Sequence, residues 1–371
     1  MNTLHILDGF HAAGIEKQAF EIINHLPKNG NKNFLFNILP EIKDLESDFK
    51  NLLIQKKLEK IENLNIKSPF FLIYSIYKFC KKNRVDSLII YPCNKKIIYV
   101  ILGAKLARTN NIFIQVQNVI ATTKKLEIIK LRLLFMIFNI LGTFLVPASK
   151  SIYDSLIKLK IKNYKIQTIY NSCDTDQIKK ISDLARIKYK SYKTKNIIMI
   201  ARLDTIKDQE TLLKAFAKLK KPYWNLKIVG QGPKLSYLRN LCLKLSLNPD
   251  EIFIGITNNV GKLLGESEIF AFSTTELEGF GKVLIEAMAA NLPIIASDVS
   301  ACREILLEGK AGILVPPGDV KSWEKNLNKL IENYHYRVKL KENLKELVKI
   351  YDSKEIAIQW ESLLKRELKN F

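Results

Sequence analysis

Short apolar runs alternate with helix-like segments along the first half of the chain. The apolar run at residues 4–7 is followed by a polar loop and then by residues 15–26, where apolar side chains recur at helical spacing. Further apolar runs at 33–39, 87–91, 112–116 and 142–146 alternate with helical patterns, among them 70–82 and 96–108. Buried strands that alternate with helices predict a doubly wound parallel α/β sheet.

The same alternation starts again in the second half. Around a helical segment at 208–219, strands are expected at 196–200, 226–229, 252–254, 269–272 and 294–296. Residues 178–195, between the two series, are polar and rich in lysine, which places the domain boundary near residues 171–195. We therefore predict two doubly wound α/β domains, 1–170 and 171–351, and an amphipathic helix at 352–371. Two such domains joined by a short linker leave a cleft between them, where ligands of these sheets bind.

The composition is that of a folded protein in a reducing compartment. A chain of 371 residues with 47% hydrophobic and 26% charged residues suits two domains and contains no tract typical of disorder. Its five cysteines are scattered without a CxxC pair or nearby histidines in metal-ligand spacing, which favours free thiols. The first fifteen residues contain Asp8 and His11 and lack the pattern of a signal peptide. A cytoplasmic location is expected.

The most apolar segment covers residues 131–146. Arg132, Asn139 and Gly142 interrupt it, and it is shorter than the roughly 20 residues that span a bilayer. We expect a buried or interfacial helix rather than a membrane span.

The basic charge is concentrated in the first half. The net charge is +22, and residues 1–170 contain 26 Lys and Arg against 12 Asp and Glu, a net +14. Nucleic-acid binding would need interleaved stacking aromatics or a groove-entering motif, and neither is found. Contact with an anionic membrane surface needs only clustered basic residues beside apolar ones. That contact and a lysine-rich composition without functional meaning both remain open.

The clearest candidate chemistry lies in the second half. Arg202 directly follows an expected strand, and Lys207 precedes the next expected helix. Two fixed cations at the carboxyl edge of a parallel sheet suit a diphosphate.

A second candidate segment runs from Glu278 to Glu286, through a glycine-containing loop into a helix. Gly279 and Gly281 allow a ligand to approach the backbone, and the helix start offers unpaired N–H groups to an anion. Glu286 can accept hydrogen bonds from sugar hydroxyls. Without the glycines, two glutamates eight residues apart would indicate only a solvent-exposed helix face.

These segments together resemble a known family. Arg202 and Lys207, residues 229–233 (VGQGP), Glu278 and Glu286, residues 291–297 and residues 312–319 resemble the retaining glycosyltransferases of family 4 in order and spacing. The resemblance covers the second domain and extends more weakly to residues 13–16 and 169–174.

The resemblance implies a GT-B fold, with two Rossmann-like domains facing across a cleft and the helix at 352–371 packed back on the first. It implies retaining transfer of a hexosyl or N-acetylhexosaminyl group from a nucleotide diphosphate-sugar, without a metal or other cofactor. The acceptor would be a glycan or lipid-linked intermediate of lipopolysaccharide, capsule or polyprenyl-linked polysaccharide, met at the inner face of the cytoplasmic membrane.

The resemblance also assigns residues by position. The catalytic residues would be Arg202, Lys207 and Glu278, with the two cations on the donor diphosphate. The donor-binding residues would be Gly14, Gln117, Asn118, Gly230, Gly279, Phe280, Gly281, Lys282, Val283 and Glu286. Among these, Glu286 would bind the ribose and Gly14 would close over the diphosphate.

The sequence departs from the family pattern at several positions. Ala13 replaces the first loop glycine, residues 172–173 are Ser-Cys instead of Gly-Val, and Thr275 replaces a serine. Residues 114–118 lack the histidine that contacts the donor sugar in many relatives, so Gln117 or Asn118 would have to take over its hydrogen bonds.

Two apparent sites carry less weight. Asp174-Thr-Asp176 has the D-x-D spacing of metal-dependent sugar transferases, but it falls in the expected linker, so we assign no metal there. His11 could approach the acceptor or have no ligand role.

Two other function classes remain open. A GT-B enzyme resembling nucleotide-sugar 2-epimerases would release an isomerised nucleotide-sugar without an acceptor. A non-catalytic module that senses nucleotide-sugar or binds nucleic acid would bind its ligand without turnover. Acceptor choice is expected to depend on the loops at 8–14, 40–68, 91–96 and 117–130.

Overall fold

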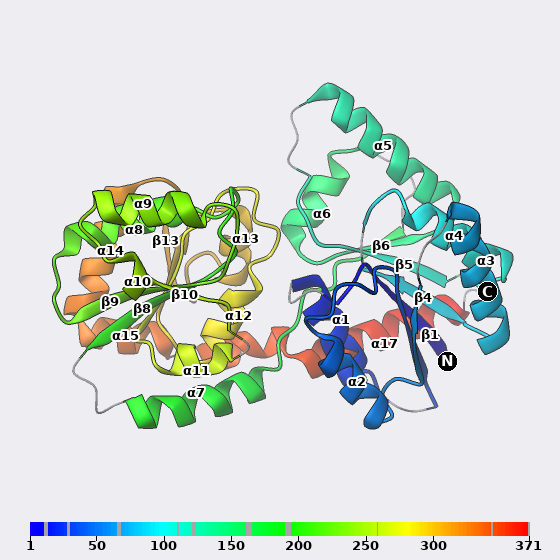
Figure 1. The fold of residues 1–371 in the computed structure, drawn as a ribbon, viewed down its shortest axis with the longest axis horizontal. Coiled ribbons are helices and arrows are strands. Elements are labelled where there is room, and N and C mark those ends of the chain that lie inside the picture. Colours follow the sequence, from blue (N-terminus) through cyan, green and yellow to red (C-terminus); the bar gives the residue numbers. More distant parts are fainter. Residues whose placement is uncertain are drawn as a thin grey trace. The chain divides into compact units, whose positions relative to one another are not determined.

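The chain forms two compact units (Figure 1). The computed structural model describes residues 1–10, 14–27, 30–64, 68–91, 93–109, 111–120, 124–160, 165–189, 194–257, 259–342 and 344–369. Unit 1 consists of Met1–Ser172 and Ser353–Phe371, and unit 2 of Cys173–Asp352.

The described part of unit 1 is built on a seven-stranded parallel sheet in the order β3-β2-β1-β4-β5-β6-β7. Its strands are β1 (Asn2–Leu7), β2 (Lys32–Asn37), β3 (Lys60–Asn63), β4 (Ser87–Ile90), β5 (Asn111–Val116), β6 (Phe144–Pro147) and β7 (Lys165–Ile166). Its helices are α1 (Gly14–His25), α2 (Glu46–Ile54), α3 (Pro69–Asn83), α4 (Ile97–Leu106), α5 (Lys125–Ile140), α6 (Lys150–Ile157) and α17 (Ser353–Lys369).

Each face of this sheet carries its own hydrophobic core. Leu88 and Ile90 on β4 belong to the core under α3 to α6, and Ile89 between them belongs to the core under α1, α2 and α17. This alternation follows from the two-residue period of a strand. Trp360 of α17 is fully buried in the second core, 6.4 Å from the ring of Phe113. The C-terminal helix therefore packs against the sheet of unit 1.

A buried histidine on β1 is expected to make the protein sensitive to acid. His5 is fully buried, with Nδ1 2.9 Å from the Tyr91 hydroxyl and Nε2 3.4 Å from Asn33 Oδ1. Burial lowers the pKa of His5 from 6.5 to about 4, against a smaller opposite effect of the Asn33 hydrogen bond. Below pH 6.5 the unfolded chain binds a proton that the folded chain rejects. The free energy of unfolding should therefore fall by up to about 3 kcal/mol as the pH drops from 6.5 to 4.

Chemical denaturation at pH 7 and at pH 4.5 measures this loss. His5→Gln should remove that part of the pH dependence, whereas His335→Gln, at an exposed position, should leave it unchanged. Equal pH dependence in the wild type and in His5→Gln would contradict the prediction.

Unit 2 is built on a six-stranded parallel sheet in the order β10-β9-β8-β11-β12-β13, as far as its residues are described. The strands are β8 (Lys195–Ile200), β9 (Trp224–Val229), β10 (Phe253–Gly255), β11 (Ile269–Phe272), β12 (Ile294–Ser297) and β13 (Ile313–Val315). The helices are α7 (Thr175–Tyr189), α8 (Gln209–Leu219), α9 (Leu235–Lys244), α10 (Pro249–Ile252), α11 (Val260–Gly265), α12 (Lys282–Ala289), α13 (Ser300–Ile305), α14 (Val320–Glu332), α15 (Tyr334–Lys341) and α16 (Leu344–Leu347), followed by the 3-10 helix η1 (Val348–Tyr351).

The order of both sheets has a topological switch point. In unit 1 the strand order reverses between β1 and β4, and in unit 2 between β8 and β11. Loops that leave such a pair of strands at their carboxyl ends diverge to opposite faces, which is where open α/β sheets bind ligands. The predicted doubly wound α/β architecture is thus present in each unit.

The lysine-rich segment at 178–195, near which the sequence placed the domain boundary, is largely helical and belongs to unit 2. Ser182 and Ala185 of α7 are buried against α11. A Cβ on Gly265 of α11 would lie 2.2 Å from the Ser182 carbonyl oxygen, so the two helices are in backbone contact. A narrow buried face made of small residues carries little hydrophobic signal, and the sequence pattern missed it for that reason.

The apolar segment at 131–146 contains two elements instead of one helix. Helix α5 ends at Ile140, the chain turns at Gly142 with φ +63°, and β6 begins at Phe144. A glycine with positive φ ends a helix without steric cost. The apolar residues before Gly142 belong to a helix, and those after it belong to a buried strand. None of the helices in the described residues is long and apolar enough to cross a bilayer.

The unit boundary lies two residues after the predicted one, because two linker residues bind unit 1. The Asn171 amide exchanges hydrogen bonds with the Gln117 amide at 2.9 and 2.7 Å, and the Ser172 N–H donates to Gln18 Oε1 at 2.7 Å. The predicted acceptor loop at 40–68 also contains regular structure, since α2 and β3 lie within it.

Candidate functional site

The candidate cationic residues lie at the switch point of unit 2. Residues 201–208 leave the carboxyl end of β8, and residues 273–281 leave the carboxyl end of the neighbouring strand β11. The sequence predicted this edge of the sheet from the position of Arg202 and Lys207, and the strand order brings the glutamate segment to the same edge.

Backbone hydrogen bonds fasten these two loops together. Lys207 and Thr274 form an isolated antiparallel bridge. The Thr275 N–H donates to the Ile206 carbonyl at 3.0 Å, and the Asp208 N–H donates to the Ser273 carbonyl at 3.1 Å. Residues from both predicted motifs are therefore held as one cluster before any ligand binds.

Lys207 is the cation at the centre of this cluster. Its side chain is 14% exposed, its ammonium forms an ion pair with Glu278, and it lies 4.8 Å from the centre of the Phe272 ring. An ammonium held by a carboxylate on one side and an aromatic face on the other has few accessible rotamers. Lys207 is thus a preorganised cation at the edge of the sheet.

Glu278 is held by residues that the sequence analysis did not single out. Its carboxylate, 9% exposed, lies 3.2 Å from the Thr274 hydroxyl, and the Thr274 N–H donates to Ser297 Oγ at 2.8 Å. The hydroxyl of Thr275, noted from the family pattern, instead donates to the Ile206 carbonyl at 2.9 Å. Thr274 and Ser297 could have been found from their positions, because each lies at the carboxyl end of a strand at the same edge.

Arg202 presents its guanidinium on the solvent side of the cluster. Its side chain is 73% exposed, and Nε lies 3.3 Å from Asp204 Oδ2. Its backbone is fixed, since the buried Gln209 donates to the Arg202 carbonyl at 2.8 Å. The loop therefore has a rigid backbone and an exposed cationic side chain that a ligand can reach.

Glycines bring the loop after β9 into contact with the arginine loop. Gly230 has φ +144°, and a Cβ there would lie 2.0 Å from the Ala201 carbonyl oxygen. A Cβ on Gly232 would lie 2.3 Å from the Leu203 carbonyl oxygen. The Leu203 N–H also donates to the Gln231 carbonyl at 2.9 Å. Only glycine permits this approach, so Gly230 shapes the loop that carries Arg202.

The glycine-containing loop ends at the start of α12. Gly281 adopts φ +84° at the N-cap, and Lys282 and Val283 are the first residues of the helix. Phe280 is buried and packs edge-on against Tyr351, 6.1 Å away. The eight-residue helix points its positive dipole end toward the loop that contains Gly279, which favours an anion there. Glu286 is 8% exposed, one turn further along α12.

The predicted donor-binding residues Gly14, Gln117 and Asn118 belong to unit 1. Gly14 begins α1 and is exposed, whereas Ala13 and His11 lie outside the described residues. Asn118 is exposed, but the Gln117 amide is engaged by Asn171. Gln117 therefore has a structural partner that the sequence did not indicate.

Two of the predicted acceptor loops meet at the switch point of unit 1. The Asn94 side chain donates to Asp8 Oδ2 at 2.7 Å, which joins the loop after β1 to the loop after β4. A carboxylate and an amide at this edge offer hydrogen-bond partners for hydroxyl groups.

The D-x-D segment has a structural role at the start of α7. The Gln177 N–H donates to Asp174 Oδ1 at 2.9 Å, as in an N-terminal helix cap. Within the described ranges, no group of three or more His, Cys, Asp or Glu side chains could hold a metal ion.

A thiol beside the cluster is not poised for nucleophilic chemistry. Burial raises the pKa of the fully buried Cys302 well above its usual value, and the Glu278 carboxylate raises it further. A neutral buried thiol is a poor nucleophile. Cys302 is therefore no candidate nucleophile for this site.

The two units together define a fold class. Two Rossmann-like units in one chain, each with a switch point in its sheet, are the architecture of the GT-B fold. Residues 182–347 match the family model of the glycosyl transferases group 1, and this region contains Arg202, Lys207, Glu278 and Glu286. Within the second unit the chain is therefore similar to the glycosyl transferases group 1.

Curated relatives agree with this class. The N-acetylgalactosamine-N,N'-diacetylbacillosaminyl-diphospho-undecaprenol 4-alpha-N-acetylgalactosaminyltransferase of Campylobacter jejuni is 30% identical over 217 residues, 57% of each chain. The N-acetyl-alpha-D-glucosaminyl L-malate synthase of Bacillus anthracis is 28% identical over 220 residues, 58% of this chain and 57% of that one. The chain spans a little over half the length of these two relatives. An uncharacterized glycosyltransferase of Methanocaldococcus jannaschii is 24% identical over 364 residues, 91% of each chain.

Solved structures establish the GT-B fold. HepE of Anabaena, in complex with UDP and glucose, superposes with a TM-score of 0.81 at 18% identity, over 99% of this chain and 100% of that one. The sucrose-phosphate synthase of Thermosynechococcus elongatus superposes with a TM-score of 0.74 at 16% identity over the full length of both chains. The predicted GT-B fold class is thus confirmed.

Proposed function

We propose that this protein transfers a sugar from a nucleotide diphosphate-sugar to an acceptor, with Arg202 and Lys207 binding the donor diphosphate. The observation that carries the proposal is the preorganised cluster at the unit 2 switch point, where Lys207 is held by Glu278 and Arg202 projects from the same loop after β8. HepE, which shares the fold, was solved with UDP, and this supports a nucleoside diphosphate as the leaving group.

The electrostatics of the cluster suit the proposed reaction. Cleavage of the bond between an anomeric carbon and a diphosphate develops negative charge on the leaving oxygen. Each preorganised donor aimed at such a charge is typically worth about 2.7–4 kcal/mol, or roughly 10²–10³ in rate. Lys207, Arg202 and the first N–H groups of α12 would supply these donors. Their positive charge is the reason to propose a reaction that needs no metal.

The remaining residues would bind the rest of the donor. Gly230, Gly279 and the segment from Phe280 to Val283 would surround the diphosphate and sugar, and Glu286 would accept hydrogen bonds from ribose hydroxyls. Glu278 would orient Lys207 and contact the transferred sugar. We propose retention by attack from the face that the diphosphate leaves, with a diphosphate oxygen taking the proton of the acceptor hydroxyl.

A lipid-linked or glycan acceptor at the inner face of the cytoplasmic membrane is the proposed partner. The named Campylobacter jejuni relative acts, by its name, on a diphospho-undecaprenol-linked sugar. The basic excess in residues 1–170 would suit an acceptor presented at an anionic surface. Asp8 and Asn94 at the unit 1 switch point would contact the acceptor.

A product assay tests the proposed function against its alternatives. The protein is incubated with a panel of nucleotide diphosphate-sugars, with and without polyprenyl-diphosphate-linked sugar acceptors. The masses of the products are then measured by mass spectrometry. Transfer predicts an acceptor heavier by one sugar and nucleoside diphosphate released with it. An isomerised nucleotide-sugar formed without acceptor would establish a 2-epimerase instead. Binding of nucleotide-sugar without any product would indicate a sensing module.

A further inference from the structure

Helix α5 of unit 1 presents an apolar stripe to solvent. Six large apolar side chains on it are between 41% and 80% exposed, and we call them the α5 stripe: Leu126, Ile129, Leu133, Met136, Ile137 and Ile140. In Figure 1, α5 lies along the outer edge of unit 1, beyond β6 and α6. Contiguous exposed apolar surface of this kind marks a contact with another apolar phase.

The stripe is continuous and separate from the side of α5 that packs on the sheet. Its members are spaced by three, four, three, one and three residues, so at 3.6 residues per turn they share one side of the helix. Phe135 and Phe138 are buried on the opposite side, where they join the hydrophobic core. Only that inner side packs against the rest of unit 1. The stability of unit 1 therefore does not explain why the outer stripe is apolar.

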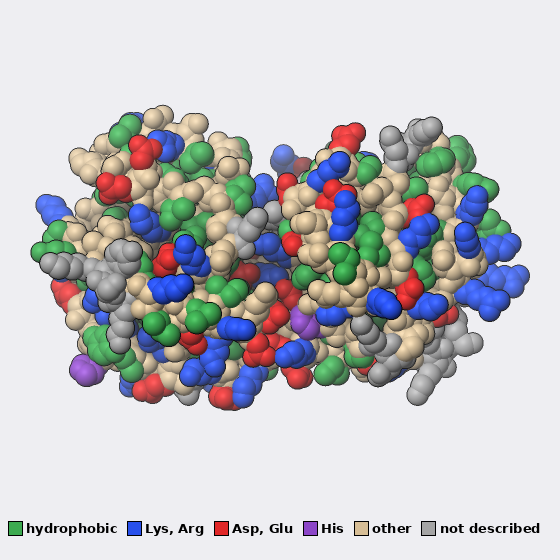
Figure 2. All heavy atoms as spheres, turned by 60° about the horizontal axis from the view of Figure 1, so that its bottom comes forward, with side chains coloured by type: hydrophobic (Ala, Val, Ile, Leu, Met, Phe, Trp, Pro, Cys, Tyr) green, Lys and Arg blue, Asp and Glu red, His purple; other side chains and the backbone are tan. Residues whose placement is uncertain are grey.

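Basic side chains flank the stripe on both margins. At 100° per residue, Lys130 lies on one margin, and Lys125 and Arg132 lie on the other. Long basic side chains beside apolar ones can extend to a polar headgroup layer while the apolar ones enter the acyl region. The one acidic residue within α5 is Glu127, whose carboxylate lies 3.9 Å from Lys124. On the face shown in Figure 2, by contrast, basic side chains are interspersed with acidic ones.

We propose that the α5 stripe docks unit 1 on an anionic lipid surface, with α5 lying in the plane of the membrane. A helix of 16 residues is about 24 Å long, shorter than the roughly 30 Å hydrocarbon core, which agrees with an in-plane position. The purpose of this docking, access to a lipid-linked acceptor, rests on the proposed function, whereas the docking itself does not.

A second copy of the chain fits the stripe less well. In a two-fold symmetric pair the same surface meets itself, so the basic margins of one stripe would face the basic margins of the other. Anionic headgroups would neutralise Lys125 and Lys130 instead. The charge pattern therefore selects lipid as the occupant.

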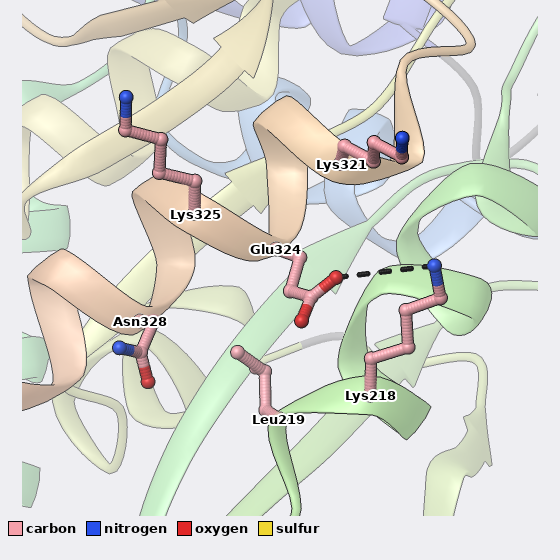
Figure 3. Close-up of a pocket in the computed structure, with 6 residues that line it drawn as sticks. All are labelled: Lys218, Leu219, Lys321, Glu324, Lys325 and Asn328. Carbon is pink, nitrogen blue, oxygen red and sulfur yellow. Dashed lines mark ion pairs between the residues drawn. The ribbon is translucent and has the colours of Figure 1, made fainter.

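A pocket in unit 2 carries no comparable argument. It has a volume of about 390 Å³ and lies between α8 and α14, lined by Lys218, Lys321 and Lys325 with Glu324 and Asn328 (Figure 3). Glu324 lies 3.9 Å from Lys218 and partly neutralises the pocket. None of these polar lining side chains is buried, so the pocket supports no assigned ligand.

Sedimentation with lipid vesicles tests the proposal. The wild type should bind vesicles that contain phosphatidylglycerol, and binding should weaken in pure phosphatidylcholine and at high salt. The triple variant Leu133→Gln/Met136→Gln/Ile140→Gln should bind about 100-fold more weakly, because it removes apolar surface from the stripe. The matched control Ile54→Gln/Ile187→Gln/Leu243→Gln changes side chains that are 78%, 74% and 64% exposed on α2, α7 and α9, and it should bind like the wild type.

A second pair of variants tests the basic margins. Lys125→Gln/Lys130→Gln should weaken binding to anionic vesicles by about tenfold and leave the weak binding to neutral vesicles unchanged. The control Lys43→Gln/Lys244→Gln removes the same charge from exposed positions outside α5 and should have less than a twofold effect.

Two outcomes would overturn the proposal. One is a wild type that does not sediment with anionic vesicles at low salt. The other is light scattering that shows a wild-type dimer converted to a monomer by the stripe variant while vesicle binding is unchanged, which would assign the stripe to a second copy. Vesicle binding needs neither donor nor acceptor, so its failure would leave the proposed sugar transfer standing. Unchanged transfer to a water-soluble acceptor would show that the stripe variant is correctly folded.

Discussion

Lys207→Ala is expected to lower the rate of sugar transfer by about 10²–10³, the typical effect of losing one preorganised donor to a developing negative charge. The side chain is held by the Glu278 carboxylate and the Phe272 ring before substrate binds, so its contribution requires no reorganisation. Arg202→Ala should lower the rate as well, but less, because its guanidinium is 73% exposed and has more rotamers to lose on binding. Steady-state rates of nucleoside diphosphate release in the presence of acceptor measure both effects.

Loss of stability must be separated from loss of chemistry in these variants. Lys207→Ala leaves Glu278 largely buried without its cation, which is itself destabilising. Lys207→Gln keeps a hydrogen-bond donor near Glu278 and removes only the charge, so it should melt closer to the wild type and remain as inactive as the alanine variant. Lys214→Ala is the matched control, because Lys214 also pairs with a carboxylate, Glu210 at 2.5 Å, but outside the cluster. Near-normal turnover in both Arg202→Ala and Lys207→Ala would contradict the proposal that these two cations stabilise the leaving diphosphate.

Gly230→Ala is expected to destabilise the protein by about 4 kcal/mol, the combined cost of strained backbone and overpacking. The added Cβ would lie 2.0 Å from the Ala201 carbonyl oxygen, at a backbone φ of +144°. Backbone atoms cannot move away as the end of a flexible side chain can, so the loops after β8 and β9 would have to separate. Chemical denaturation followed by tryptophan emission reports on unit 2 through the buried Trp224 and Trp323.

Gly255→Ala separates the two causes. Gly255 has φ +83° but no atom within 4 Å of an added Cβ. Only the cost of the strained backbone therefore applies, and the free energy of unfolding should fall by about 1 kcal/mol. Similar losses in the two variants would mean that close approach to Ala201 does not matter.

The alternation of strands and helices could be predicted from sequence because buried parallel strands are continuous apolar runs. Residues 269–272 and 208–219 were predicted nearly to the residue, as β11 and α8. Helix α7 was missed because the side chains that it buries, Ser182 and Ala185, are small and carry little hydrophobic signal. The outer stripe of α5 was missed for a different reason. A periodicity of apolar residues does not reveal which side of a helix is covered. Only the structure shows that Phe135 is buried and that Met136 is exposed.

The sequence predicted which loops carry the candidate site, but not which of their side chains contact one another. Glycines, cations and strand ends placed Arg202, Lys207 and Glu278 at one edge of a sheet. Side-chain pairing depends on strand order, since β8 and β11 are neighbours in the sheet but far apart in the chain. For that reason the ion pair of Lys207 with Glu278 and the roles of Thr274 and Ser297 came only from the structure.

A crystal structure with a nucleoside diphosphate bound tests the central claim most directly. The account predicts pyrophosphate oxygens within hydrogen-bond distance, about 2.7–3.2 Å, of the Lys207 ammonium or the Arg202 guanidinium, beside the first N–H groups of α12. A pyrophosphate bound far from both side chains would contradict it.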